Sequence, residues 1–134
     1  MVELVFEVGN KHELVAKPKK TRNGLYMNSH RWTAFVRSVK PNPPMCHFAD
    51  KVRFGLHETF GVDHIDVRSE AGKNFEISYN GWGTFTVPMT IYWKKKTGLK
   101  TLTVDHYLNF EDKGEWRQIS VLIDKKRMSD LASS

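Results

Sequence analysis

The 134 residues are the length of one ordinary domain. A chain of this length buries about two thirds of its unfolded surface, so it needs no disulfide or metal ion to stabilise its fold. A single cysteine, Cys46, excludes a disulfide framework and favours a reducing compartment. The 21 basic and 15 acidic side chains leave a net charge of +6, which suits contact with a polyanion but is also common among solvated domains.

Neither a membrane span nor a secretory signal is predicted. No stretch approaches the ~18 consecutive apolar residues that a spanning helix needs. The first residues, Met1 to Leu4, lack the basic and then apolar order of a signal peptide. We therefore expect a soluble intracellular protein.

Alternating apolar and polar residues dominate the chain, whereas no window of helical length keeps a clear apolar face. Candidate strands in chain order cover residues 2–8, 32–37, 51–56, 65–69, 74–79, 86–93, 102–108 and 118–123. Turn-forming clusters separate them, such as Asn23-Gly24 and the proline-rich residues 40–44. About eight short strands with turns every ~8–15 residues predict an all-β antiparallel sandwich or barrel.

Two local features refine this pattern. Pro88 lies inside a strand pattern, and because proline has no N–H to donate, we expect a sheet edge or a bulge at this position. The basic and polar residues 125–134 are predicted to be a C-terminal tail after a domain of residues 1–124. This tail is expected to fray rather than to hold a helix.

The residues that could carry chemistry form no recognisable catalytic or metal-binding pattern. There is no nucleophile elbow and no glycine-rich phosphate loop. Cys46 and His47 are adjacent, and neighbouring side chains of a strand point to opposite faces. A zinc site built from these two residues with His57 and His64 would match no common ligand spacing. We expect no enzyme, no cofactor and no metal.

Basic side chains cluster in three runs, which we interpret as charged loops with contact to nucleosomal DNA as the alternative. The runs are residues 17–22, 94–96 and 125–127. Trp32 beside Arg31, and Trp93 beside Lys94, could form base-stacking platforms. Both tryptophans also lie on the apolar side of their strand patterns, and a core position is favoured for each.

Two segments have the character of pocket loops at one end of a sandwich. Residues 54–61 begin as a strand and then continue into a polar cluster that contains Phe60. Trp82 lies between Gly81 and Gly83, which allow close approach of another chain, while the indole supplies a flat apolar wall. The alternative for each segment is a turn that caps the core.

Three segments, taken in order, resemble the YEATS family. The segment His30 to Arg37 (HRWTAFVR) resembles the family's His-x-Trp strand. The segment His47 to Phe60 (HFADKVRFGLHETF) resembles its long central signature. Gly81 to Phe85 (GWGTF), followed by Pro88 and residues 91–94, resembles the family's pocket loop and the next strand. The resemblance covers residues 2–110.

The resemblance implies an immunoglobulin-like sandwich whose loops bind acetyl-lysine and longer acyl-lysines, such as crotonyl-lysine, on histone tails. It also implies a nuclear location and membership of a chromatin-remodelling, acetyltransferase or transcription complex. A reader of this kind binds its peptide without catalysis.

The same resemblance assigns roles to five residues. Phe60 and Trp82 are the two walls around the flat acyl-amide, and Phe85 closes the back of the channel. Thr59 forms a hydrogen bond with the amide through its hydroxyl, and the backbone N–H of Trp82 donates to the acyl carbonyl. His57 shapes the rim.

Further candidates surround these residues. Gly81 and Gly83 flank Trp82 in its loop and are also candidate binding residues. Three polar side chains are possible rim or peptide contacts: Asn28, His30 and Glu58. The sequence leaves open whether Tyr26 or Asn28 lines the pocket.

Physical chemistry supports an acyl-lysine ligand. A buried amide has one donor and one acceptor, and leaving either unpaired costs about 1–3 kcal/mol. An unmodified ammonium would carry three donors into the same slot. Two alternatives stay open, a methyl-lysine cage and a nucleic-acid-binding or scaffold domain of a chromatin complex.

The domain and a histone tail are both basic, so their net charges repel each other, and a local feature must offset this repulsion. Either an acidic patch faces the peptide, or the basic loops contact DNA. The candidates for such a patch are Glu58, Asp63, Asp66 and Glu70.

Overall fold

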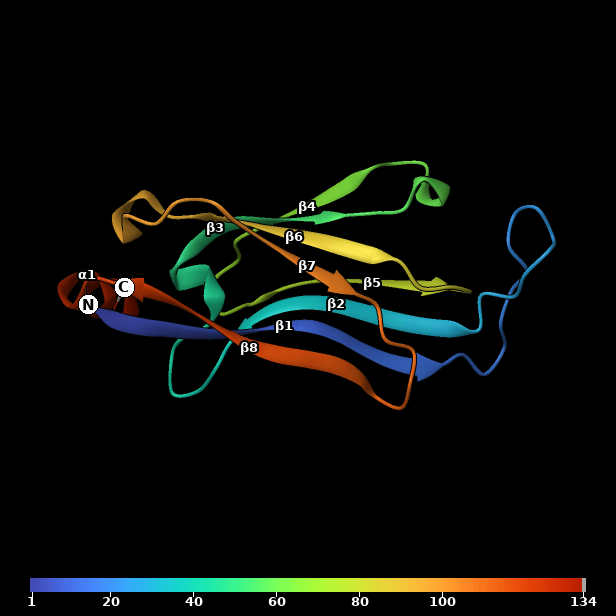
Figure 1. The fold of residues 1–134 in the computed structure, drawn as a ribbon, viewed down its shortest axis with the longest axis horizontal. Coiled ribbons are helices and arrows are strands. Elements are labelled where there is room, and N and C mark those ends of the chain that lie inside the picture. The colour runs from blue at the N-terminus through green and yellow to red at the C-terminus, as the bar shows by residue number, and fades with distance from the viewer. Residues whose placement is uncertain (134) are drawn as a thin grey trace.

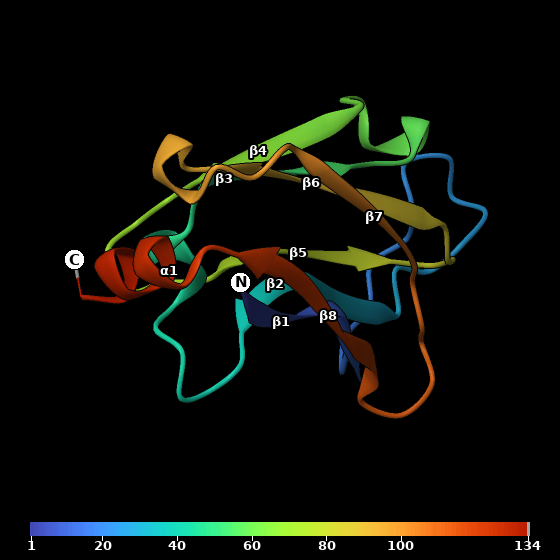
Figure 2. The ribbon, with the colours of Figure 1, turned by 60° about the vertical axis from the view of Figure 1, so that its left-hand side comes forward.

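Eight strands form where apolar and polar residues alternate, which confirms the all-β prediction. The computed structural model describes residues 1–133. Two antiparallel four-stranded sheets pack face to face, with strand orders β5-β2-β1-β8 and β4-β3-β6-β7 (Figures 1 and 2). The strands are β1 (Val2–Leu14), β2 (His30–Ser38), β3 (Ala49–Gly55), β4 (His64–Arg68), β5 (Phe75–Gly81), β6 (Thr86–Trp93), β7 (Leu102–Tyr107) and β8 (Gly114–Ile123).

Four helical elements complete the described chain. They are the 3₁₀ turns η1 (Met45–His47), η2 (Glu58–Phe60) and η3 (Lys95–Thr97), and the helix α1 (Lys125–Ala132). Among residues 1–133, no helix has the length and apolar character to cross a membrane.

Helix α1 corrects the expectation that the C-terminal stretch frays. The carboxylate of Asp124 caps the helix by accepting hydrogen bonds from the backbone N–H groups of Lys126 and Arg127, at 3.0 and 3.1 Å. Leu131 is buried and joins the core of the sandwich. Met128 also packs against this core, and two apolar residues, Met128 and Leu131, in an eight-residue helix are too few to predict an amphipathic stripe from sequence. Ser134 of the predicted tail lies outside the described residues.

The core lies between the two sheets and follows the alternation of each strand. In β1, Leu4, Phe6 and Val8 are fully buried. Trp32 in β2 and Trp93 in β6 are 0% and 8% exposed, which confirms the core position expected for both. Full burial of each large apolar side chain contributes roughly 1.5–3 kcal/mol to the hydrophobic stabilisation.

Pro88 does not mark an edge strand, because β6 lies between β3 and β7. The pairing of β6 with β3 ends at Met89, which faces Phe54, so the ladder with β3 has stopped before the proline. Beyond that pair lies Gly55, where an added Cβ would stand 2.8 Å from Cδ of Pro88. The missing N–H is tolerated here because the ladder with β3 has ended, and the glycine leaves room for the ring.

A buried polar cluster links the two sheets. Asn10 in β1 is fully buried, and its Oδ1 accepts from Nε2 of His106 at 2.6 Å and from the backbone N–H of Asn109 at 2.9 Å. Its Nδ2 donates to the carbonyl of Asn109 at 2.8 Å. Burial, with a contribution from Arg117, lowers the pKa of His106, which favours the neutral ring with Nε2 as the donor.

Three connections meet at one end of the sandwich, opposite the end that holds η3 and α1 (Figure 1). They are the β1–β2 loop of residues 15–29, the segment with η2 between β3 and β4, and the turn of residues 82–85 between β5 and β6. Sheet order brings the first and third connections together, since β2 pairs with both β1 and β5, whereas the segment with η2 belongs to the facing sheet.

Candidate functional site

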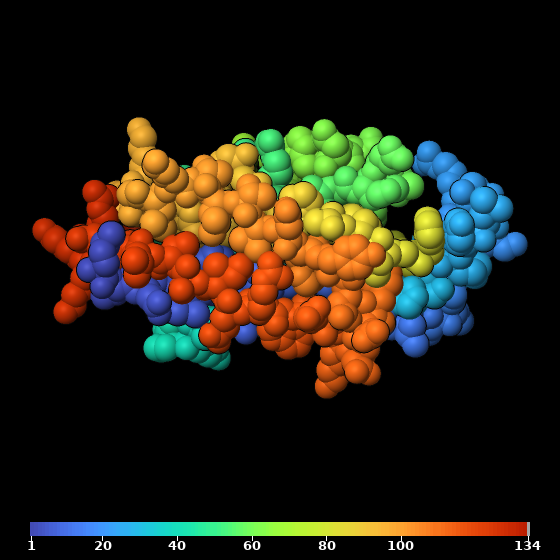
Figure 3. Space-filling view, in the orientation of Figure 1, coloured from blue at the N-terminus to red at the C-terminus, as the bar shows by residue number. Residues whose placement is uncertain are grey.

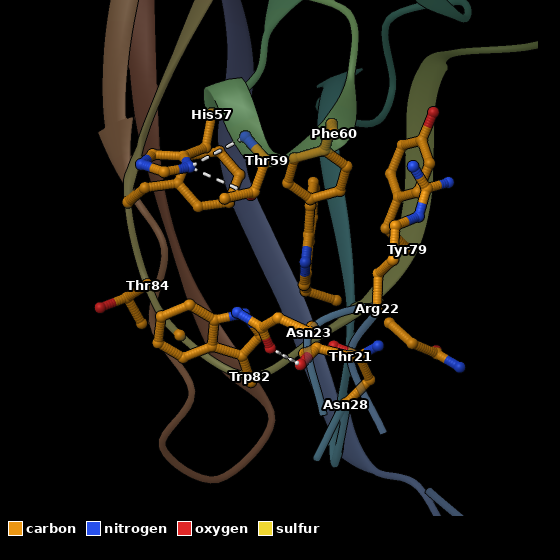
Figure 4. A pocket seen from close by; sticks show the side chains of 15 residues that line it. Thr21, Arg22, Asn23, Asn28, His57, Thr59, Phe60, Tyr79, Trp82 and Thr84 are labelled. Carbon is orange, nitrogen blue, oxygen red and sulfur yellow. Dashed lines mark hydrogen bonds between the residues drawn. The ribbon is translucent and has the colours of Figure 1, made fainter. Parts of the chain in front are cut away.

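A cavity of about 740 Å³ opens among these three connections. Figure 3 shows the surface hollowed there, beside the β1–β2 loop. The lining residues are Thr21, Arg22, Asn23, Asn28, Trp32, His57, Thr59, Phe60, Tyr79, Asn80, Gly81, Trp82, Gly83, Thr84 and Phe85. Figure 4 shows many of these side chains turned toward a shared space.

Aromatic rings form the base of the cavity. Phe60 packs edge-on against Tyr79 with ring centroids 5.2 Å apart and lies 5.6 Å from Phe85. Trp32 meets both Phe60 and Phe85 edge-on, at 6.1 and 5.8 Å. The rings that form the apolar base therefore pack against one another in the absence of a ligand. Phe60 and Phe85 are predicted pocket residues. For Trp32 the sequence predicts a core position, with a base-stacking platform as the alternative, and for Tyr79 only a strand.

Trp82 forms the opposite wall and is 44% exposed. Tyr26, from the β1–β2 loop, stacks on it with ring centroids 4.0 Å apart and planes 7° from parallel. Tyr26 therefore covers one face of the indole, while Trp82 also lines the cavity. Of the two residues between which the sequence could not choose, Asn28 lines the cavity, whereas Tyr26 lies outside its lining and contacts Trp82.

Thr59 presents a hydrogen-bond acceptor to the cavity. Nδ1 of His57 accepts from the backbone N–H of Thr59 at 3.3 Å and lies 3.0 Å from its Oγ1 (Figure 4). A nitrogen that accepts from the N–H has no proton, so the hydroxyl hydrogen must also point toward it. The lone pairs of Oγ1 then remain free for an N–H of a ligand.

The backbone N–H of Trp82 is a candidate donor. Trp82 follows Gly81, the last residue of β5, which pairs with His30. Within residues 1–133, this N–H takes part in none of the turn and loop hydrogen bonds. Thr84 anchors the same loop, because its Oγ1 lies 2.8 Å from the hydroxyl of Tyr107 in β7. Oγ1 of Thr59 and the N–H of Trp82 thus offer a ligand one acceptor and one candidate donor, beside the polar side chains of the lining such as Asn28 and Arg22.

The charge in the cavity is positive. No Asp or Glu is among the lining residues, whereas Arg22 is. In the part of the chain that the structure describes, Arg22 forms no ion pair. The sequence predicts that the basic residues 17–22 form a charged loop. Only the turn signal Asn23-Gly24 indicates that this loop reverses direction, and nothing in it predicts that Arg22 lines the cavity.

Two predicted rim residues lie away from the cavity lining. Nδ1 of His30 is 2.8 Å from Nε2 of His12, and its ring stacks on Phe110 with centroids 4.6 Å apart. Burial, with the nearby His12, lowers the pKa of His30, so its neutral form is favoured. Glu58 is exposed on η2 and also lies outside the lining, whereas the other predicted residues line the cavity.

Two of the four acids in the predicted acidic patch, Asp66 and Glu70, are paired with Lys or Arg side chains. Asp66 accepts from Arg53 at 2.8 Å and from Lys51 at 3.3 Å, which holds the pKa of its carboxyl well below the usual range. Glu70 pairs with Lys73 at 2.8 Å. Across residues 1–133, no group of three or more His, Cys, Asp or Glu side chains is arranged to hold a metal ion.

Comparison with known sequences finds a family that matches the part of the chain containing the cavity segments. A family model described as the YEATS family matches residues 27–112. The Protein AF-9 homolog of Saccharomyces cerevisiae is 34% identical over 89 residues, which are 66% of this chain and 38% of that protein. The Gibberella zeae homolog is 30% identical over 87 residues, 65% of this chain and 32% of that protein. The chain therefore matches less than half the length of these curated relatives.

Solved structures share the fold over almost the whole chain. The crystal structure of yeast AF-9 homolog protein Yaf9 has a TM-score of 0.76 at 22% identity and covers 99% of this chain and 87% of that one. The Yaf9 YEATS domain bound to H3K27ac has a TM-score of 0.77 at 21% identity, with coverages of 99% and 94%. The Yaf9 YEATS domain recognizing an H3K122suc peptide has a TM-score of 0.70 at 23% identity, again with coverages of 99% and 94%.

Proposed function

This chain belongs to the YEATS family, and from its cavity we propose that it is a non-catalytic reader of acylated lysine on histone tails. One observation carries the proposal: the cavity lined by Phe60 and Trp82 contains an available acceptor, Oγ1 of Thr59, and a candidate donor, the backbone N–H of Trp82. An acyl-lysine amide is flat and neutral, and its one N–H and one C=O can pair with these two groups.

The charge of the slot favours an amide over a cation. An unmodified lysine would bring an ammonium with three donors into a cavity whose lining contains no carboxylate and one arginine. A methylated lysine would be attracted by aromatic faces, but its positive charge would meet Arg22 as well. The methyl-lysine alternative is therefore the weaker one.

The relatives support the same ligand class and a chromatin setting. The Yaf9 domain is bound to H3K27ac in one structure and recognizes an H3K122suc peptide in another. Another relative, 31% identical over 87 residues, is the Transcription initiation factor TFIID subunit 14b of Arabidopsis thaliana. We accordingly place the protein in the nucleus, in a chromatin or transcription complex, with an acylated histone tail as its partner.

The function is tested by titrating the protein with one histone-tail peptide in unmodified, acetylated and crotonylated forms at physiological salt. An acylated form is expected to bind at least about tenfold more tightly than the unmodified form, a difference of about 1.4 kcal/mol. Equal affinity for all three forms would contradict the reader function.

Arg22 is expected to favour acyl groups that end in a carboxylate, such as succinyl. Substitution Arg22→Gln should lower the affinity for a succinylated peptide by about threefold and leave that for the acetylated peptide unchanged, since exposed ion pairs contribute about 0–1 kcal/mol. Isothermal titration calorimetry with both peptides measures the difference.

The matched control is Lys17→Gln, which removes the same charge from the same loop outside the cavity lining. An equal loss of succinyl-peptide affinity in both variants would assign the effect to net charge and not to a contact with Arg22.

A further inference from the structure

Six exposed cations gather at the end of the sandwich that lies opposite the cavity. They come from two runs of the sequence, one at η3 and one at α1, and we call this surface the basic end. Its members are Lys95, Lys96, Lys100, Lys125, Lys126 and Arg127. Figure 3 shows η3 (orange) and α1 (red) at this same end of the molecule.

Defined contacts hold the two runs together. Nη1 of Arg127 donates to the carbonyl of Lys96 at 2.8 Å, and the guanidinium packs 3.3 Å from the position of a Cβ on Gly98. Helix α1 is itself fixed by its cap at Asp124 and by Leu131 in the core. The position of the two runs beside each other is therefore fixed by contacts within the fold.

The basic end has little internal compensation. Among the described residues, none of its six side chains is in an ion pair. Five other cations each pair with a carboxylate: Arg31, Arg37, Lys51, Arg53 and Lys73. Asp124, the acid nearest in the chain, directs its carboxylate to backbone N–H groups of α1. Like charges held together in this way repel one another and attract a polyanion.

We propose that the basic end binds the phosphodiester backbone of duplex DNA. Lysine and arginine neutralise phosphates and release counterions, which gives binding without reading of base sequence. The choice of DNA among polyanions rests on the proposed function, because a histone tail is presented beside nucleosomal DNA.

The geometry allows both ligands at once. Strand β1 has 13 residues and runs from the basic end to the loop of the cavity (Figure 1). At ~3.3 Å per residue it separates the two sites by about 40 Å. A tail in the cavity would not cover the basic end, so the two contacts would add to the affinity for a nucleosome.

The test is a fluorescence-polarisation titration of a labelled DNA duplex at several salt concentrations. The variant K95Q/K96Q/K125Q/K126Q should bind at least about tenfold more weakly at physiological salt, and its dependence on salt should be shallower by up to about four units of slope. Arg127 is left in place because it holds α1 against η3.

The matched control K11Q/K17Q/K19Q/K20Q removes the same charge from exposed lysines at the cavity end, and its DNA affinity should stay within about twofold of the wild type. Equal losses in both variants would overturn the proposal, because net charge alone would explain them. Equally tight binding of polyglutamate by the wild type would also overturn it, in favour of an acidic protein.

A parallel titration with the acylated peptide separates this proposal from the reader function. The K95Q/K96Q/K125Q/K126Q variant should bind that peptide as the wild type does, which also shows that it is folded. Wild-type protein that binds the peptide but not DNA would refute the DNA site alone. Protein that binds DNA through the basic end but discriminates no acylated peptide would refute the reader function alone.

Discussion

Replacement of Trp82 by alanine is expected to weaken binding of an acylated peptide by about thirtyfold or more, because truncation of a central aromatic contact costs about 2 kcal/mol or above. Trp82 is 44% exposed and lies outside the core, so the substitution removes a wall of the cavity and leaves the sandwich intact. Fluorescence polarisation with the acetylated and crotonylated peptides measures the loss.

The matched control is Trp116→Ala. Trp116 is 40% exposed, but it lies in β8 and packs on Phe35 at 6.1 Å, away from the cavity. Peptide affinity should change by less than about twofold in this variant, since a residue outside the contact contributes little. Equal affinities of the Trp82→Ala variant and the wild type would show that the cavity is not the peptide site.

Substitution Asn10→Ala is expected to lower the free energy of unfolding by about 4 kcal/mol, a large share of the 5–15 kcal/mol typical of a domain. The change leaves Nε2–H of His106 and both backbone groups of Asn109 without the partners they have in the fold. A buried unsatisfied polar group costs about 1–3 kcal/mol, so three such groups account for the total. Urea unfolding of wild type and variant measures it.

Thr90→Ala provides the comparison, because Thr90 makes one exposed hydrogen bond, at 3.0 Å to Thr103 on the neighbouring strand. Its removal should cost under about 0.5 kcal/mol. Similar midpoints for the Asn10→Ala variant and the wild type would mean that water replaces the lost contacts, and that the cluster does not hold the sheets together.

Local sequence patterns were sufficient to predict the strands and the segments that carry the site. Side chains alternate along a strand whatever its neighbours are, so eight strands and the buried Trp32 and Trp93 could be predicted from residue order alone. The resemblance to the YEATS family likewise rests on contiguous residues, and the segments from His57 to Phe60 and from Gly81 to Phe85 do converge on one cavity.

The composition of that cavity and of the basic end depended on the tertiary structure. Tyr26 reaches Trp82, and Arg22 reaches the cavity, because β2 pairs with both β1 and β5, and this choice of neighbours is not contained in any single strand pattern. Lys96 and Arg127 meet because α1 docks on the core through Leu131. Sequence alone determined the elements and the signature residues, since these follow from local periodicity and contiguous motifs. Which distant loops share a site was decided by sheet order and packing, which depend on contacts made across the whole chain.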